Sequence, residues 1–82
     1  MEKHDAQSGL PHTKVWAGQE WLHHKGGLYV IVAIGVKEDT GEQMIVYRSQ
    51  KYGTVWIRNV DNWFQNVLTP EGEVPRFTEL TR

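Results

Sequence analysis

A chain of 82 residues is long enough for one small domain and too short for two domains that each bury a core. It contains no cysteine, which excludes disulfides, thiolate metal sites and cysteine nucleophiles and fits the reducing cytoplasm, where we expect the protein to reside. A formal net charge of -1 argues against a surface that binds duplex nucleic acid through electrostatics alone. We find neither the apolar core of a signal peptide nor the roughly 20 apolar residues of a membrane span, so we expect no membrane association.

The first residues differ in character from the rest of the chain. Residues 1–14 combine Gly9 and Pro11 with scattered polar residues and show no periodicity, which predicts a flexible N-terminal arm. We expect a single domain over residues 15–82. It contains segments rich in β-branched and aromatic residues, which are typical of strands, at 15–24, 28–37, 42–49 and 54–60.

Turn sequences separate these segments and predict antiparallel pairing. KEDTGE, SQKYGT and TPEGEV each contain a glycine, Gly41, Gly53 or Gly72, at a position where a tight turn favours a positive φ. After the fourth segment, Asp61 is the expected N-cap of a short 3₁₀ or α turn. The apolar run Leu28–Val36 is typical of a strand buried on both faces. The pattern therefore predicts a mainly β fold, a small SH3-like antiparallel barrel.

Several of these stretches also resemble a known family. WLHHKGGLY from Trp21, VYR at 46–48, WIR at 56–58 and VPRF at 74–77 are similar to motifs of the DUF1653 family, in the same order. That family groups small bacterial and phage proteins of unassigned function, and the resemblance implies an SH3-type barrel over Trp21 to Phe77 but no activity. Asn59 departs from the family pattern, which usually has proline there, and this difference bears on how the chain leaves the fourth strand.

The stretch HHKGG at 23–27 raises three hypotheses, a metal site, a phosphate loop and a tight turn. Adjacent residues of a strand point to opposite faces, so we do not expect His23 and His24 to bind one metal ion, and we expect no cofactor. A phosphate loop would lead into a helix N-terminus, whereas these glycines precede a strand. The favoured interpretation is a two-residue turn in which Gly26 and Gly27 both have positive φ and Lys25 is exposed.

The segment around Trp56 contains the strongest candidate for a binding site. With a period of two, Trp56 and Arg58 share one face of a strand, while Val55 and Ile57 share the other, which we assign to the core. An exposed tryptophan beside an arginine can stack on a planar group and pair with its negative charge. An equally acceptable interpretation is that Arg58 merely covers the Trp56 ring.

Other residues extend this candidate site. Pairing of the third and fourth segments would bring Arg48 near Trp56, although Arg48 also fits an ordinary surface ion pair. Tyr52 is a candidate hydroxyl donor at the rim, and His23 and Lys25 complete the candidate ligand-binding set. No nucleophile motif and no paired carboxylates accompany them, so we expect no enzymatic activity and no catalytic residues.

Two functions agree with these residues. The first is a non-enzymatic module that binds or sequesters a nucleotide-like or other planar anionic ligand, where a homo-oligomer could build a pocket that one small barrel cannot hold. The second is an SH3-like module that grips an extended or proline-containing peptide of a partner protein. The dependence of affinity on salt concentration distinguishes the two functions, because an anion site should lose affinity steeply as ionic strength rises.

Overall fold

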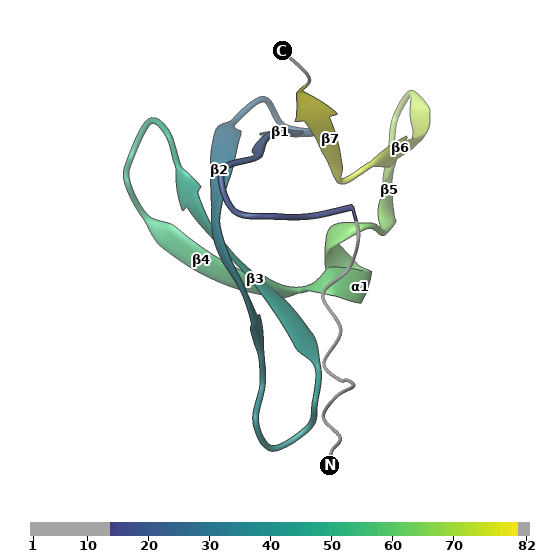
Figure 1. Ribbon diagram of the computed structural model, residues 1–82. Coiled ribbons are helices and arrows are strands. Elements are labelled where there is room, and N and C mark those ends of the chain that lie inside the picture. The colour runs from purple at the N-terminus through teal and green to yellow at the C-terminus, as the bar shows by residue number, and fades with distance from the viewer. Residues whose placement is uncertain (1–13, 81–82) are drawn as a thin grey trace.

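The computed structural model describes residues 14–80, so the predicted arm at 1–14 lies almost entirely outside the described part of the chain. The mainly β fold class is confirmed. In chain order, the elements are β1 (Glu20–His23), β2 (Leu28–Val36), β3 (Gln43–Ser49), β4 (Val55–Asn59), α1 (Val60–Trp63), β5 (Asn66–Thr69), β6 (Gly72–Pro75) and β7 (Phe77–Leu80) (Figure 1). Across residues 14–80, we find no helix with the length and apolar character needed to cross a membrane.

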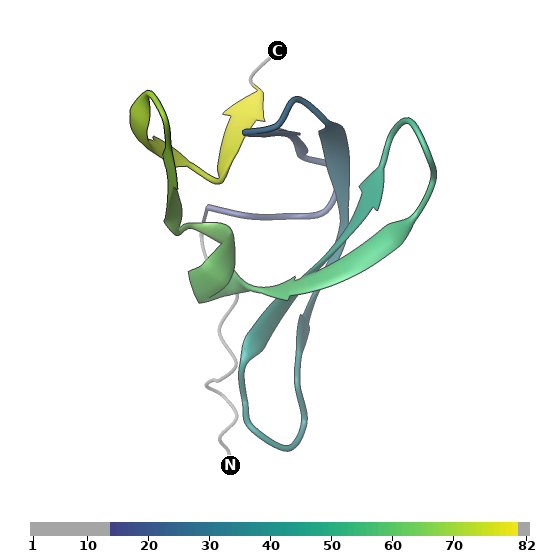
Figure 2. The same cartoon turned by 180° about the vertical axis from the view of Figure 1, so that it is seen from behind.

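The strands form one large antiparallel sheet and one hairpin. The sheet has the order β4-β3-β2-β1-β7, and β5 pairs with β6 separately. The large sheet curves around the core, and α1 and the β5–β6 hairpin lie on the side between its two edge strands (Figures 1 and 2). Because β4 and β7 do not pair with each other, no closed barrel is found within residues 14–80.

The concave face of the large sheet carries the core. On β3, Ile45, Tyr47 and Ser49 are buried, and the residues between them are more exposed, which is the alternation expected of a strand with one covered face. Trp63 of α1 packs onto this face. Its ring stacks on Phe77 of β7 with ring centroids 3.7 Å apart, and its side chain is only 1% exposed. The short helix therefore contributes a central side chain of the core.

The expectation that β2 is buried on both faces is wrong. Ile31 is the buried residue of this strand, whereas Val32 and Val36 are exposed. The pairing of β2 with β3 also shifts register between Ile31 and Ala33. The convex face of the sheet has no second layer in residues 14–80 (Figures 1 and 2), so apolar character alone did not indicate burial there.

The backbone angles of the turn glycines agree with the predictions in three turns and differ from the prediction in the fourth, HHKGG. Positive φ angles occur at Gly41 (77°), Gly53 (74°) and Gly72 (117°), as predicted. In HHKGG, Gly26 has a φ of 105° but Gly27 is not in the positive region, so the predicted two-residue turn is wrong. Four residues separate β1 from β2, and the Gly26 N–H donates a hydrogen bond of 2.8 Å to the carbonyl of His23, the last residue of β1.

Gly26→Ala should lower the free energy of unfolding by about 1 kcal/mol, because an L side chain is strained at this φ. Nothing lies within 4 Å of the added Cβ, so crowding does not contribute. Gly35→Ala in β2 is the matched control, since its surroundings are equally open and its φ is not positive. Thermal unfolding measures both variants, and equal melting temperatures would contradict the strain argument.

α1 begins differently from the prediction. Its N-cap is Asn59 and not Asp61, because the Asn59 side-chain oxygen accepts the Asn62 N–H at 2.7 Å. Asn59 Nδ2 also donates to a Glu42 carboxylate oxygen at 2.9 Å. The residue that stands where the resembling family usually has proline therefore caps the helix and ties it to the turn between β2 and β3.

Candidate functional site: an aromatic pocket with an arginine

A pocket of about 160 Å³ opens beside the core, and every strand of the large sheet contributes to it. Strand register explains how these residues meet. Tyr47 lies opposite Trp56 in the β3–β4 pair, and His23 lies opposite Phe77 in the β1–β7 pair. The lining residues are His23, Tyr29, Tyr47, Trp56, Arg58 and Phe77.

Trp56 and Arg58 share the pocket face of β4, while the predicted core role of Val55 and Ile57 is wrong. Both of these residues are exposed, with Ile57 65% exposed, because their side of β4 is the uncovered convex face. The strand period of two was predicted correctly. The prediction from hydrophobicity, however, placed Val55 and Ile57 in the core, and their side of β4 is the exposed one. Trp56 stays 52% exposed at the pocket, so its ring is accessible to a ligand.

Three of the six candidate ligand-binding residues lie in this pocket, namely His23, Trp56 and Arg58. Arg48 does not, because it pairs with Val55 and thus lies on the convex face, against the expectation that it joins the same patch. Tyr52 lies in the β3–β4 turn, where Lys51 Nζ is 5.3 Å from its ring centroid. Lys25 is exposed in the turn after β1 and is not part of the pocket lining.

Arg58 is held by uncharged partners. Its Nε donates to the Tyr47 hydroxyl at 3.3 Å, and its Nη1 donates to the Asn62 side-chain oxygen. No carboxylate within residues 14–80 forms an ion pair with Arg58. Its guanidinium carbon lies 5.8 Å from the Phe77 ring centroid, so the ring that it covers is Phe77. The pocket therefore contains an oriented positive charge that no anion compensates there.

His23 adds a titratable group beside Arg58. Its ring is perpendicular to Phe77 at 5.0 Å, and its Nδ1 accepts the Lys25 backbone N–H at 3.1 Å. Burial lowers the pKa of His23 from its ordinary value of 6.5, and four nearby cationic groups lower it further: His24, Arg58, Lys25 and Arg76. Every charged group that lowers this pKa is cationic, so an anion bound beside His23 would be attracted to these groups.

The two histidine rings lie together, contrary to the expectation that they point to opposite faces. Their centroids are 4.4 Å apart, because β1 ends at His23 and His24 belongs to the turn. No group of three or more potential metal ligands occurs within residues 14–80. His4 and His12 lie outside that range.

The stability of the protein should fall at mildly acidic pH through His23. The unfolded chain takes up a proton near the ordinary pKa of 6.5, whereas the folded protein does so only at lower pH, so the free energy of unfolding decreases as pH falls through 6.5. His23→Gln removes this difference. Melting temperatures recorded from about pH 7.5 to about pH 5.5 should fall more for the wild type than for the variant. Parallel pH profiles would show that His23 does not titrate as proposed.

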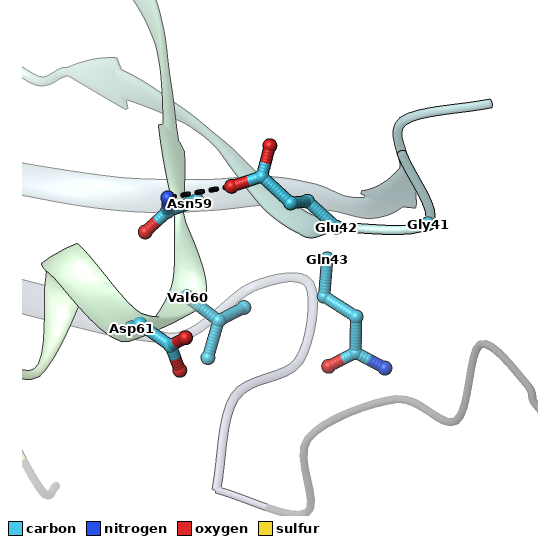
Figure 3. A pocket seen from close by; sticks show the side chains of 6 residues that line it. All are labelled: Gly41, Glu42, Gln43, Asn59, Val60 and Asp61. Carbon is cyan, nitrogen blue, oxygen red and sulfur yellow. Dashed lines mark hydrogen bonds between the residues drawn. The ribbon is translucent and has the colours of Figure 1, made fainter. Parts of the chain in front are cut away.

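A second, larger pocket of about 260 Å³ has the opposite electrostatic character. It lies where the turn before β3 meets the end of β4 and the start of α1 (Figure 3). Glu42 and Asp61 supply carboxylates, and Asn59 holds Glu42 by the hydrogen bond drawn in the figure. This pocket does not suit an anion. The remaining lining residues are Gly41, Gln43 and Val60.

The sequence analysis missed part of the pocket that contains His23, Trp56 and Arg58, which we call the anion-favouring pocket. It assigned no functional role to Phe77, although this ring forms the pocket wall and contacts both His23 and Arg58. Asn62 was missed as well, although it orients Arg58. The pairing of β7 with β1 joins residues more than fifty positions apart, and no local pattern reveals it. Tyr29 and Tyr47 also line the pocket, and for them the sequence agreed equally with hydroxyl donors at the rim and with core packing.

Fold and site together define a small antiparallel β domain with a cationic, aromatic pocket. The profile of a family described as a protein of unknown function, DUF1653, matches residues 19–79. The chain belongs to this family. A crystal structure of a DUF1653 protein from Bordetella bronchiseptica is similar, with a TM-score of 0.71 and 23% identity over 84% of this chain and 92% of that one. At this identity, the likeness supports the fold alone. No curated protein matches the chain.

Proposed function

We propose that the protein is a non-enzymatic binding module for a small planar anion, which occupies the pocket of His23, Trp56 and Arg58. The Arg58 guanidinium, which forms no ion pair within residues 14–80 and lies beside the half-exposed Trp56 ring, is the observation that carries this proposal. A ring bound there would stack on an aromatic wall, and its anionic group would accept charge-assisted hydrogen bonds from Arg58. The anion would also favour the protonated form of His23.

Pocket size narrows the ligand class. A volume of about 160 Å³ is below the 300 to 1,000 Å³ or so of sites for drug-sized molecules. A cavity of about 150 Å³ accommodates one benzene-sized ring. The pocket therefore suits a single ring that bears a carboxylate, and a nucleotide would leave its sugar and phosphate outside. Aromatic carboxylates are the ligand class that we favour.

The lining also supports a function without catalysis. Among the described residues, it contains no carboxylate, serine, threonine or thiol, and its titratable imidazole, His23, has no carboxylate among the groups that shift its pKa. We propose no cofactor. The absence of cysteine in the sequence is the support for a cytoplasmic location.

A panel of four probes tests the proposal by calorimetry on the full chain. Nicotinate and benzoate combine a ring with a carboxylate and should bind. Benzamide lacks the charge and inorganic phosphate lacks the ring, so each should bind at least about tenfold more weakly. Equal affinity for benzoate and benzamide would refute an anion site, and equal affinity for benzoate and phosphate would refute a stacking site.

A peptide-binding module in the manner of SH3 domains is the second candidate. The half-exposed Trp56 at the pocket favours it, because aromatic rims of this kind grip extended or proline-containing peptides. Such binding would depend on Trp56 and vary little with salt or with loss of Arg58. We also propose the SH3-like type for the fold, supported by the five curved antiparallel strands and the single helical turn that follows β4 (Figure 1).

A further inference from the structure

β4 is an edge strand with an unusual surface. In residues 14–80, its one paired neighbour is β3, and no strand lies beyond it (Figure 1). Three successive residues of this strand, Val55, Trp56 and Ile57, are more than half exposed. Proteins commonly protect such edges with proline, bulges or inward-pointing charged residues, because free backbone groups pair readily with another strand. β4 contains no proline and no bulge, and its one inward-pointing charge, Arg58, is held on the pocket side by Tyr47 and Asn62.

The register identifies which backbone groups of β4 are free. The Ser49 N–H donates to the Thr54 carbonyl at 2.9 Å, which makes Ser49 and Thr54 a hydrogen-bonded position of the β3–β4 hairpin. Such positions alternate along an antiparallel pair, so Trp56 and Arg58 direct their backbone groups toward β3. Val55 and Ile57 therefore direct their N–H and C=O groups away from the sheet, and Asn59 directs its N–H there, since its C=O is used as the N-cap of α1.

We infer that β4 pairs with β4 of a second copy of this chain, antiparallel about a two-fold axis at Ile57. This register is the one that pairs all five residues of the strand, because Val55 then lies opposite Asn59 and Trp56 opposite Arg58. Ile57 meets its own copy, so its N–H and C=O pair across the axis, and the Asn59 N–H of each strand lies opposite the Val55 C=O of the other.

Side-chain chemistry supports the same register. Trp56 and Arg58 of different copies become directly opposed, which forms two symmetric cation–π pairs. An axis at Arg58 would instead oppose two like charges. At the ends of the strand, the β3–β4 turn with exposed Lys51 extends toward the α1 end of the second copy. There, Glu42 and Asp61 line the acidic pocket of Figure 3.

The dimer would also enlarge the anion-favouring pocket, although the inference does not depend on a ligand. Trp56 and Arg58 line that pocket in each copy, so pairing would bring a second tryptophan and a second arginine beside its mouth.

Light scattering on the full chain, without ligand, tests the inference at about 100 μM and after about tenfold dilution. The wild type should have about twice the chain mass of 9.5 kDa at the higher concentration. Ile57→Lys places two like charges at the axis and should halve the mass. Leu68→Lys is the matched control, because Leu68 is 86% exposed on β5 and its replacement adds the same charge. It should stay dimeric.

Two further measurements keep the inference falsifiable if Ile57→Lys perturbs folding. Mixing Ile57→Lys with Ile57→Asp chains should restore the dimer, because the opposed charges then attract. In the wild type, the Ile57 amide should exchange with deuterium slowly, and faster upon dilution. A monomeric wild type, a dimer with a freely exchanging Ile57 amide, or no restoration on mixing would overturn the inference. Monomers that bind nicotinate would refute the dimer alone, and dimers that bind no probe would refute only the proposed function.

Discussion

Replacing Trp63 with alanine should lower the free energy of unfolding by about 3 to 5 kcal/mol, which is a large fraction of the stability of a small domain. The side chain is 1% exposed and stacks on Phe77 at 3.7 Å. It also makes perpendicular contacts with Tyr47 at 4.8 Å and Trp21 at 5.5 Å. Its loss would leave a ring-sized cavity where α1 meets the sheet.

Trp16→Ala provides the matched control for this prediction. The residue type and the volume removed are the same, but Trp16 is 55% exposed and lies outside the core cluster. Its replacement should change stability by less than about 1 kcal/mol. Urea unfolding followed by circular dichroism compares the two variants. Similar midpoints would contradict the packing described for Trp63.

Replacing Arg58 with glutamine should weaken nicotinate binding by at least about tenfold, because a hydrogen bond to a charged group contributes about 1.5 to 3 kcal/mol. Glutamine can still bond to Tyr47, the partner of the Arg58 Nε, so the pocket wall is retained in part. Raising the salt concentration should likewise weaken the binding of nicotinate to the wild-type protein.

Arg48→Gln is the control for Arg58→Gln, because it removes the same charge from the convex face, one residue from the Tyr47 position on β3. Its affinity for nicotinate should match the wild type. Calorimetry on both variants, with melting temperatures recorded alongside, separates loss of binding from loss of fold. Equal effects of the two substitutions would mean that long-range charge, and not the pocket, governs affinity.

Local patterns predicted much of the fold because they reflect local physics. The glycines at 41, 53 and 72 have the positive φ angles that their turns require, and the alternation on β3 follows from the strand period. Burial was harder to predict, because it depends on what covers each face. β2 is apolar along its length, yet its convex side faces solvent. For the same reason, Ile57 was assigned to the core.

The candidate site was predictable only where one strand supplied it. Trp56 and Arg58 share a face of β4 by the period of two, and no distant contact is needed to see this. The contribution of Phe77 depends on the return of β7 to β1, which brings the end of the chain beside its first strand. Asn62 orients Arg58 only because α1 begins directly after β4.

The most direct test of the anion pocket is the indole N–H spectrum of the four tryptophans during a nicotinate titration, recorded by two-dimensional NMR on the full chain. Binding at the proposed site should shift the Trp56 indole signal and the ring signals of His23, which share the pocket. The signal of Trp16, which lies outside the pocket lining, should not move. A shift of the Trp16 signal, or unchanged Trp56 and His23 signals at saturating nicotinate, would contradict the account.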